Sequence, residues 1–438
     1  MSGDKYAWSV GTPPPVLDPH SAAKHELVRS YLSEYIDILT SDPRQDLLNI
    51  TLVDGFAGGG QYTYQGGIVP GSPLIFLQEI EVARARLDLR KRKQFRLNAE
   101  FVFVEQKRSN FEFLQSVLRE SPFGGLVGES VYPIRGTLAN EIRRIIQRIR
   151  DRGTAHRSIF LFDQYGYNQV TLACIRHILA ELANPEIILT FNVDWLINYQ
   201  SEKDEFLKAV MPIELGLTDV KRMLTMKNDQ REARWFIQHF LYKHIVEQTG
   251  APFYTCFYVV SPDSNRSYWL LHISGHPRAR DEMARRHWAM STHSVHQGKA
   301  GLNMLGFVPE RDLAQLPMDF GFDLNAETRT KAALMTELPA LIFDRRGAAS
   351  PPTLGHLFTS VCNQTAATVD LVAQSLVALR AEGEIEIVGA KGRPKPRGKN
   401  LSWNDAILPA VQRSMFSNVW PVNAVRDDGP ILPAPPNA

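Results

Sequence analysis

The chain has 438 residues, of which 44% are hydrophobic and 22% charged, and its formal net charge is +2. This length and composition are typical of a globular protein of two or three domains, and they exclude a fibrous or largely disordered chain. The near balance of charge excludes a globally basic nucleic-acid-binding protein, so any contact with phosphates has to be local.

The chain begins with an arm and a helix. Residues 1–20 contain four prolines and are predicted to form an irregular N-terminal arm. Apolar residues then recur at helical spacing, which predicts an amphipathic helix over residues 22–39. Lys24 and His25 lie in the first turn of this helix, where composition alone indicates a solvated helix end.

Residues 49–60, NITLVDGFAGGG, are the stretch around which the chain is organised. An apolar β-type run over residues 48–53 ends at Asp54, and a turn with four glycines follows. Glycines let the backbone approach a ligand closely, and a buried strand that runs into a glycine loop forms the cofactor crevice of many open parallel sheets. A plain structural turn would have the same composition, so both interpretations stay open at this point.

Short apolar strands alternate with helices after this turn, which predicts an α/β fold with a doubly wound, Rossmann-type parallel sheet. Ser72 and Pro73 form a typical start for the first of these helices. That helix ends in the basic run 90–93, which indicates either a solvated face or a contact with nucleic acid. The expected helices cover residues 73–93, 110–119, 138–150 and 171–182, and the expected strands cover residues 101–105, 131–135, 159–163 and 186–192.

The next part of the chain is predicted to complete this domain. Residues 194–250 are mostly helical in pattern and indicate an inserted cap. Residues 253–260 and 267–273 then indicate an antiparallel strand pair around a turn at 263–265, and a helix is expected over 277–289. We therefore assign residues 21–300 to one Rossmann-type domain with a helical insertion.

A second domain is expected after a loop-rich linker over residues 301–326. Helices over 327–343, 353–362 and 368–382 precede a strand at 384–388, a glycine- and proline-rich tip, and a returning strand at 401–403. This order predicts a winged-helix domain over residues 327–415, followed by a proline-rich tail over 416–438. The tip carries five cations and no acid, which suits a phosphate backbone, although a solvated loop is the alternative. These candidate nucleic-acid-binding residues are Lys391, Arg393, Lys395, Arg397 and Lys399.

Cysteine usage and hydropathy indicate a cytoplasmic protein. The three cysteines are far apart and offer neither a disulfide framework nor a metal spacing. No apolar run approaches the length of a membrane span, and the N-terminus has no signal-peptide pattern.

Three acidic residues, Asp54, Glu105 and Asp163, end predicted parallel strands, where ligands of such sheets bind. An acid in the position of Glu105 can accept hydrogen bonds from both ribose hydroxyls of an adenosine cofactor. Glu105 follows the glycine turn at about twice the usual spacing of a dinucleotide site, because residues 61–71 delay the helix. This spacing argues against NAD and for a cofactor without phosphates, S-adenosylmethionine. The candidate cofactor-binding residues are Asp54, Phe56, Gly58, Gly60 and Glu105.

Asp163, Gln164 and Tyr165 are the candidate catalytic residues. A carboxylate and a neighbouring carbonyl can accept hydrogen bonds from an exocyclic amine, and an aromatic ring can stack on the same base. Amine methyltransferases use a D-P-P-Y type of tetrapeptide for this purpose, in which Gln164 would replace the first proline. A strand-end turn with a buried tyrosine is the alternative.

No resident metal is expected. His272 and His276 are four residues apart but fall in a predicted strand and loop, so they cannot share a helix face as metal ligands. A Mg²⁺-dependent nuclease that uses the strand-end acids, with Asp54 among them, stays open as an alternative function.

Six stretches of the chain carry a resemblance to a known family. They are residues 24–27 (KHEL), 53–58 (VDGFAG), 71–74 (GSPL), 162–166 (FDQYG), 191–192 (FN) and 268–277 (YWLLHISGHP). In these stretches the chain resembles the three-Cys-motif partner protein family (TcmP) of bacteria and archaea. The resemblance implies a Rossmann-type fold like that of class I methyltransferases and, because the family is named for an adjacent three-cysteine protein, a protein partner. The usual D-P-[FY]-G of the family reads DQYG here, which leaves catalytic competence open.

Taken together, the residues and the resemblance predict an S-adenosylmethionine-dependent methyltransferase-like protein that acts on nucleic acid, on an exocyclic base amine, within a multi-protein system. The alternative from a different class is a non-catalytic nucleic-acid adaptor with a degenerate methyltransferase fold.

Overall fold

The computed structural model describes residues 6–90, 95–229, 233–260, 267–290, 294–296, 300–302, 320–321, 325–344, 351–389, 392–396 and 398–410. The predicted turn at 263–265, the tip residues Lys391 and Arg397, the tail from 416, and most of the basic run and the linker lie outside these residues. The chain divides into two compact units. The first contains Met1–Thr330 and Val361–Thr368, and the second contains Lys331–Ser360 and Val369–Ala438.

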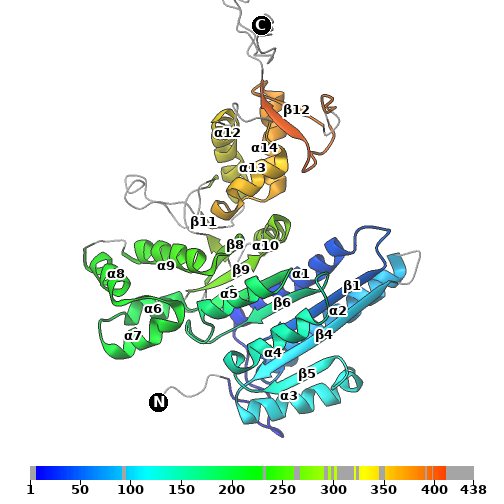
Figure 1. Cartoon of the computed structure of the whole chain (residues 1–438), viewed down its shortest axis with the longest axis vertical. Helices are drawn as coiled ribbons and strands as arrows, with labels where there is room; N and C mark the ends of the chain where they lie inside the picture. Colours follow the sequence, from blue (N-terminus) through cyan, green and yellow to red (C-terminus); the bar gives the residue numbers. More distant parts are fainter. Residues whose placement is uncertain are drawn as a thin grey trace, which may run out of the picture. The chain divides into compact units, whose positions relative to one another are not determined.

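The described residues of the first unit form one large sheet in the order β11-β10-β8-β9-β7-β6-β1-β4-β5 (Figure 1). The five strands from β7 to β5 are parallel, β9 is antiparallel to β7, and β8 is antiparallel to β9. The strands are β1 (Leu47–Asp54), β4 (Arg96–Glu105), β5 (Val131–Arg135), β6 (Arg157–Phe162), β7 (Pro185–Phe191), β8 (Phe253–Val260), β9 (Ser267–Ser274), β10 (Ser294–His296) and β11 (Phe320–Gly321).

The strand order defines the fold class. With the seven long strands numbered along the chain, the order across the sheet is 3-2-1-4-5-7-6, with the seventh strand antiparallel. This is the arrangement of the class I methyltransferase fold, a doubly wound relative of the Rossmann fold. The order reverses between β1 and β6, and ligands of such sheets bind beside the carboxyl ends of the strands at this switch point.

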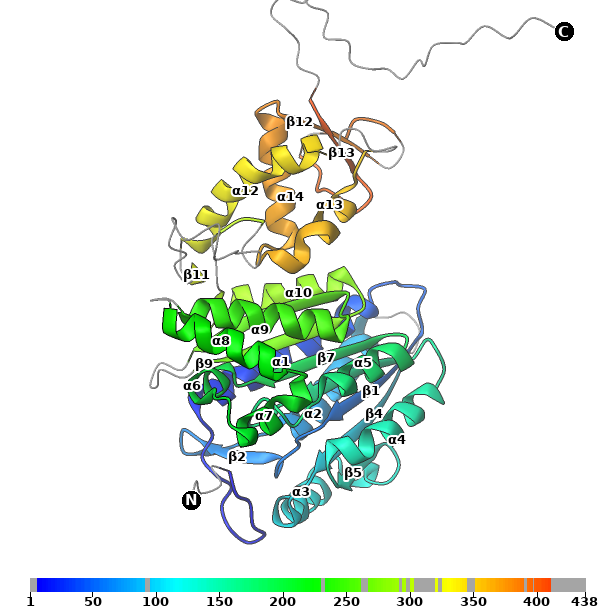
Figure 2. The ribbon, with the colours of Figure 1, turned by 60° about the vertical axis from the view of Figure 1, so that its left-hand side comes forward.

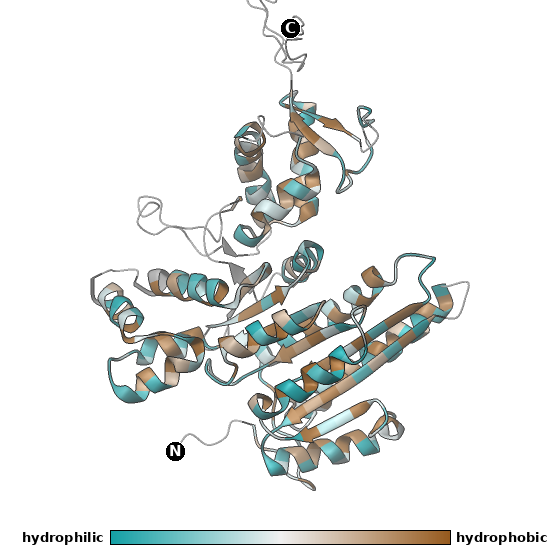
Figure 3. Cartoon of the chain, viewed as in Figure 1, coloured by the Kyte–Doolittle hydropathy of each residue, from teal (hydrophilic) through white to brown (hydrophobic). Residues whose placement is uncertain are grey.

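Helices cover both faces of the sheet because each central strand is apolar on both sides (Figure 3). On β4, Phe101 and Phe103 pack with α1, α2 and α3 on one face, whereas Val102 and Val104 pack with α4 and α5 on the other. These helices are α1 (Pro19–Leu39), α2 (Ser72–Arg90), α3 (Arg108–Glu120), α4 (Leu138–Arg150) and α5 (Leu172–Glu181). The helix α10 (Pro277–Ala289) adds Met283 to the first of these faces.

The segment between β7 and β8 is helical, as the sequence predicts. It contains α6 (Val193–Tyr199), α7 (Asp204–Val210), the short helix η2 (Met211–Ile213), α8 (Leu217–Asp229) and α9 (Ala233–Thr249). None of the helices in the described part of the chain is both long and apolar enough to cross a membrane.

Two features of the first unit differ from the prediction. Residues 61–71, predicted as a loop, form a hairpin of β2 (Gln61–Tyr64) and β3 (Gly67–Pro70). Gln65 and Gly66 both have positive φ, +50° and +81°, which fits the tight turn of a two-residue hairpin. In addition, β10 and β11 extend the sheet, although their two or three residues are too few to give a strand pattern.

The second unit contains three helices and a hairpin (Figure 2). The helices are α12 (Ala326–Asp344), which enters this unit at Lys331, α13 (Leu354–Val361), which leaves it after Ser360, and α14 (Val369–Ala381). The hairpin is formed by β12 (Ile385–Val388) and β13 (Ala406–Pro409). Thr353 forms an additional bridge with Ala406 of β13. The predicted return strand at 401–403 was wrong in position, because residues 401–405 form a turn held by Asp405, which accepts the Ser402 N–H.

Candidate functional site

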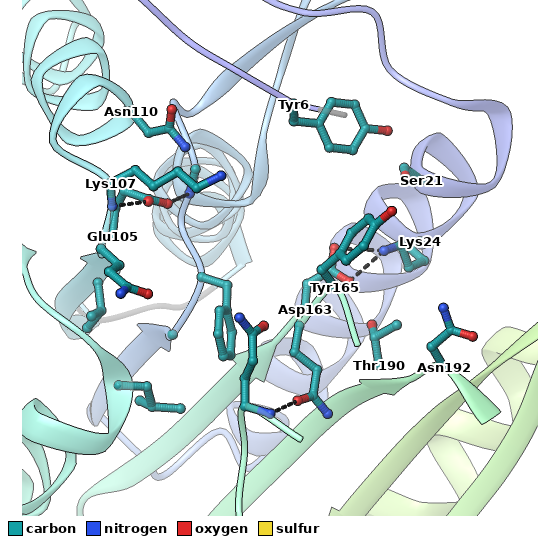
Figure 4. A pocket seen from close by; sticks show the side chains of 18 of the residues that line it. Tyr6, Ser21, Lys24, Glu105, Lys107, Asn110, Asp163, Tyr165, Thr190 and Asn192 are labelled. Atoms are coloured by element: carbon teal, nitrogen blue, oxygen red, sulfur yellow. Dashed lines mark hydrogen bonds and ion pairs between the residues drawn. The ribbon is translucent and has the colours of Figure 1, made fainter. Parts of the chain in front are cut away.

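A cavity of about 900 Å³ lies at the carboxyl ends of β1, β4, β6 and β7, beside the switch point (Figure 4). It is lined by the start of α1, the glycine turn, the start of α4, the loop after β6, and Tyr268 of β9. Residues from five of the six stretches that carry the TcmP resemblance line this one cavity. They are Lys24, His25, Gly55, Phe56, Gly58, Asp163, Gln164, Tyr165, Asn192 and Tyr268.

The most direct contact in this cavity joins Lys24 of α1 to Asp163, which follows β6. Lys24 Nζ lies 2.6 Å from Oδ1 and 2.7 Å from Oδ2 of Asp163, and 5.1 Å from the centre of the Tyr268 ring (Figure 4). The side chain of Lys24 is largely buried. The prediction of a solvated helix end at Lys24 was therefore wrong, because the start of α1 faces the cavity.

Lys24 controls the protonation of Asp163. Burial raises the pKa of Asp163, but the charge and the hydrogen bonds of the Lys24 ammonium outweigh this effect and hold the pKa below its ordinary value. Burial lowers the pKa of His25 to about 4, so its ring is neutral at pH 7. Asp163 is thus ionised at neutral pH and can only accept hydrogen bonds.

Gln164 holds the turn that follows β6. Its Oε1 accepts hydrogen bonds from the backbone N–H groups of Gln169, at 2.9 Å, and Val170, at 3.0 Å, and these bonds fix the turn after β6. Its Nε2 is buried without a hydrogen-bond partner among the described residues, although the side chain lines the cavity. A proline at position 164 could not accept these two hydrogen bonds. Gln164→Pro would therefore change the turn as well as create a D-P motif.

Tyr165 lies at the rim of the cavity with 71% of its side chain exposed. It lies two residues after Asp163 in the segment that follows β6 (Figure 4). Since the three candidate catalytic residues lie together in one cavity, the strand-end turn is placed where it can contact a ligand.

Glu105 lies on the other side of the cavity, at the end of β4 (Figure 4). One carboxylate oxygen accepts the Gly58 N–H at 3.0 Å and the other accepts the Lys107 N–H at 2.7 Å. Burial raises the pKa of Glu105, and these N–H groups and the Lys107 charge oppose that rise. A hydrogen bond from the Asn110 side chain also lowers the pKa of Glu105. A carboxylate has about four acceptor sites, so capacity remains for a ligand hydroxyl.

The glycine turn itself is placed differently from the prediction. Asp54 is fully buried and is not among the residues that line the cavity; its Oδ1 accepts the Phe56 N–H at 3.0 Å, and burial raises its pKa to about 7. Gly60 also lies outside the cavity lining, whereas Phe56 and Gly58 belong to it. Asp54 and Gly60 therefore shape the turn rather than face the cavity.

The N-terminal arm covers the glycine turn. The Trp8 indole donates to the Gln61 carbonyl at 2.8 Å and lies so close to the turn that a Cβ on Gly59 would fall within 2.3–2.6 Å of its ring. Tyr6 packs against Trp8 and Tyr62 and also lines the cavity. The glycines of this turn thus make room for an aromatic ring of the arm.

Removing the Trp8 side chain is expected to destabilise the first unit. Trp8 is buried, and its replacement by alanine leaves a cavity that costs about 3–5 kcal/mol of unfolding free energy. Chemical denaturation of Trp8→Ala, with exposed Val10→Ala on the same arm as the control, measures this cost. Equal midpoints for both variants and the wild type would show that the arm is not docked.

Several cavity residues were not predicted from the sequence as site residues: Tyr6, Ser21, Lys24, His25, Thr190, Asn192 and Tyr268. Four of them, Lys24, His25, Asn192 and Tyr268, fall in stretches that carry the TcmP resemblance. Trp8 was also missed, and a tryptophan in a proline-rich arm was the one available signal, because so large an apolar side chain is usually packed.

The candidate nucleic-acid contacts of the second unit are only partly described. Arg393 and Lys399 are exposed, whereas Lys395 forms a buried ion pair with Asp405. Lys395 therefore has its charge neutralised within the hairpin. In the part of the chain that the structure describes, no group of three or more metal-ligating side chains is found.

No family model and no curated protein matches the chain. Among solved structures, the plantazolicin methyltransferase BamL, in complex with a triazolic desmethylPZN analog and SAH, is 11% identical over 58% of this chain and 87% of that chain, with a TM-score of 0.26. Cofactor-bound Rv0187 from MTB is 14% identical over 59% and 90%, with a TM-score of 0.28. Fibrillarin from Aeropyrum pernix, with natively bound S-adenosyl-L-methionine, is 8% identical over 56% and 76%, with a TM-score of 0.25. At these TM-scores the similarity carries no argument about this chain.

Proposed function

We propose that this chain is an S-adenosylmethionine-dependent methyltransferase whose acceptor is an exocyclic base amine of a nucleic acid. The observation that carries the proposal is the ionised Asp163, held by Lys24 at the carboxyl end of β6 inside a cavity of the class I methyltransferase fold.

The cavity fits the cofactor. Its volume of about 900 Å³ is in the range of small-molecule sites. Glu105 would accept a ribose hydroxyl with its remaining capacity, and the buried Nε2 of Gln164 is a donor that still needs an acceptor. S-adenosylmethionine would supply a methyl group on a sulfonium: the acceptor nitrogen gains an N–C bond, the C–S bond breaks with its electron pair left on the sulfur as a thioether, and the nitrogen loses a proton to water.

The charge state of Asp163 favours an amine over other acceptors. A carboxylate acceptor has no hydrogen to donate to Asp163 at neutral pH. A hydroxyl acceptor would need a general base with a pKa near neutrality, whereas the pKa of Asp163 is lowered. An amine needs only acceptors for its N–H groups, and Asp163 already accepts such bonds from the amino group of Lys24.

The exposed ring of Tyr165 at the rim of the cavity favours a nucleic-acid base as the source of the amine. Tyr165 presents an exposed ring next to Asp163, and an aromatic face can stack on an extruded base. In the second unit, helices followed by a hairpin agree with the order that a winged helix requires, and its exposed Arg393 and Lys399 can contact phosphates. The TcmP resemblance adds a protein partner, which would work with this site.

Replacing Lys24 by methionine is expected to shift the pH dependence of methyl transfer. Without the ammonium, burial dominates and the pKa of Asp163 rises, so the carboxylate protonates as the pH falls and the acceptor is lost. The wild type should keep its rate from pH 8 to pH 6, whereas Lys24→Met should lose rate toward pH 6 and regain it toward pH 8. Lys243→Met, which removes an exposed lysine of α9, is the control. A pH profile of Lys24→Met that is parallel to the wild type would contradict this role.

The proposal is tested by incubating the full chain with methyl-tritiated S-adenosylmethionine and separate pools of single-stranded DNA, single-stranded RNA and duplexes. Mass spectrometry of the digested nucleosides identifies the methylated atom. An N-methylated base that disappears with Asp163→Ala supports the proposal. A label found on oxygen, on carbon or only on protein would overturn the assignment of the acceptor.

A further inference from the structure

Aromatic side chains continue from the mouth of the cavity along α6. Among the described residues, Tyr165, Trp195 and Tyr199 are exposed by 71%, 47% and 62%. A contiguous group of exposed apolar side chains, unlike a single one, can mark a binding site. We refer to these three side chains as the aromatic ridge.

The backbone connects the ridge to the cavity. Asn192 lines the cavity and caps α6, and its side-chain oxygen accepts the Trp195 N–H at 3.1 Å. The Asn192 N–H in turn donates to the Gly166 carbonyl at 3.1 Å, directly after Tyr165. Tyr165 and Trp195 are therefore carried by two segments that are hydrogen-bonded to each other at the rim.

The ridge is fixed from below by a chain of ring contacts. Trp195 and Tyr199 lie one helical turn apart on α6 with ring centres 4.7 Å apart, and Trp195 lies 5.6 Å from the buried Tyr167. The ring centres of Tyr167 and Phe191 are 6.0 Å apart, and Phe191 stacks on Trp269 with ring centres 5.5 Å apart. Because Trp195 rests on this buried column, its exposed face is held in place before any ligand arrives.

Charge decides which kind of contact the ridge can make. Residues 193–229 carry seven acidic and five basic residues, so this segment supplies no net positive charge for a phosphate backbone. Nucleobases can still stack on its aromatic rings, because every base has a flat π-face. Bases can reach such rings only where the strand is unpaired.

We propose that the aromatic ridge binds the unpaired nucleotides that flank the target base, so that the substrate is single-stranded nucleic acid. This inference rests on the proposed function for its acceptor, because the ridge begins where Asp163 and Tyr165 would hold the target. It adds the form of the substrate and the residues that recognise it.

The test measures binding of fluorescein-labelled single-stranded 12-mers and of the matching duplex to the full chain by anisotropy. Trp195→Leu keeps an apolar side chain on Tyr167 but has no aromatic face, and Trp195→Phe keeps the face. We expect Trp195→Leu and Tyr199→Leu each to weaken single-strand binding on the order of tenfold, and Trp195→Phe to stay within about threefold of the wild type. The exposed Leu89→Ala on α2 is the surface control.

Salt dependence separates stacking from charge. The slope of log K against log salt reports phosphate contacts, so it should be the same in Trp195→Leu and in the wild type. The proposal would be contradicted if Trp195→Leu kept its affinity, if the wild type preferred the duplex, or if it bound no single strand at all. It would also be contradicted if the aromatic ridge bound a protein that oligonucleotides did not displace.

Failure of the ridge can be told from failure of the proposed function. If S-adenosylmethionine binds and Asp163 is required for transfer but Trp195 has no effect, only the ridge is refuted. If single strands bind through Trp195 but S-adenosylmethionine does not bind, the surface stands as a nucleic-acid site and the methyltransferase is refuted.

Discussion

Asp163→Ala is expected to reduce the rate of methyl transfer by about 10²–10³-fold, because the acceptor for the amine N–H groups is lost. The affinity for S-adenosylmethionine should change by less than about threefold, since in our proposal Glu105, on the other side of the cavity, would hold the cofactor. Single-turnover transfer of a tritiated methyl group measures the rate, and calorimetry measures the affinity.

Two further variants separate the acceptor role of Asp163 from other effects. Asp163→Asn keeps a carbonyl oxygen that can accept an N–H group, so it should retain more activity than Asp163→Ala. The double variant Lys24→Met with Asp163→Ala avoids an unpaired ammonium in the cavity and tests whether the loss is due to misfolding. Transfer by Asp163→Ala at a rate close to the wild type would refute the role of this carboxylate.

Glu105→Ala is expected to weaken binding of S-adenosylmethionine by about 10- to 100-fold, because hydrogen bonds to a charged group contribute about 1.5–3 kcal/mol. The variant also removes the acceptor of the Gly58 N–H, which holds the glycine turn beside β4. Glu105→Gln keeps one carbonyl oxygen and should lose less. The exposed Glu120→Ala on α3 is the matched control. If Glu105→Ala and Glu120→Ala bind the cofactor equally well, Glu105 does not contact it.

The sheet could be predicted from the sequence because its central strands are long and apolar. The strand β1 and residues 101–105 of β4 have strong apolar patterns, and the acids at their carboxyl ends follow from the same pattern. The more polar start of β4, residues 96–100, was not predicted. The hairpin β2–β3 and the short strands β10 and β11 have too few residues for such a signal, and pairing with neighbours decides their conformation.

The cavity could be predicted only in part, because its decisive contacts are distant in the chain. Lys24 and Asp163 are 139 residues apart, and no local pattern links a side chain near the start of a helix to the end of a strand. Trp8 and Gly59 are likewise distant in the chain. The glycines predict a turn that a ligand can approach closely, and the structure shows that the indole of Trp8 also requires them. Gln164 broke the expected motif, and only the structure shows that its amide fixes the turn.

The central claim is that the cavity beside the switch point binds S-adenosylmethionine. Calorimetric titration of the purified full chain with S-adenosylmethionine, with circular dichroism to show that the protein is folded, tests it most directly. Our account predicts saturable binding with one site per chain, weakened in Glu105→Ala and preserved in Asp163→Ala. No heat of binding in folded protein, or binding that Glu105→Ala leaves unchanged, would contradict it.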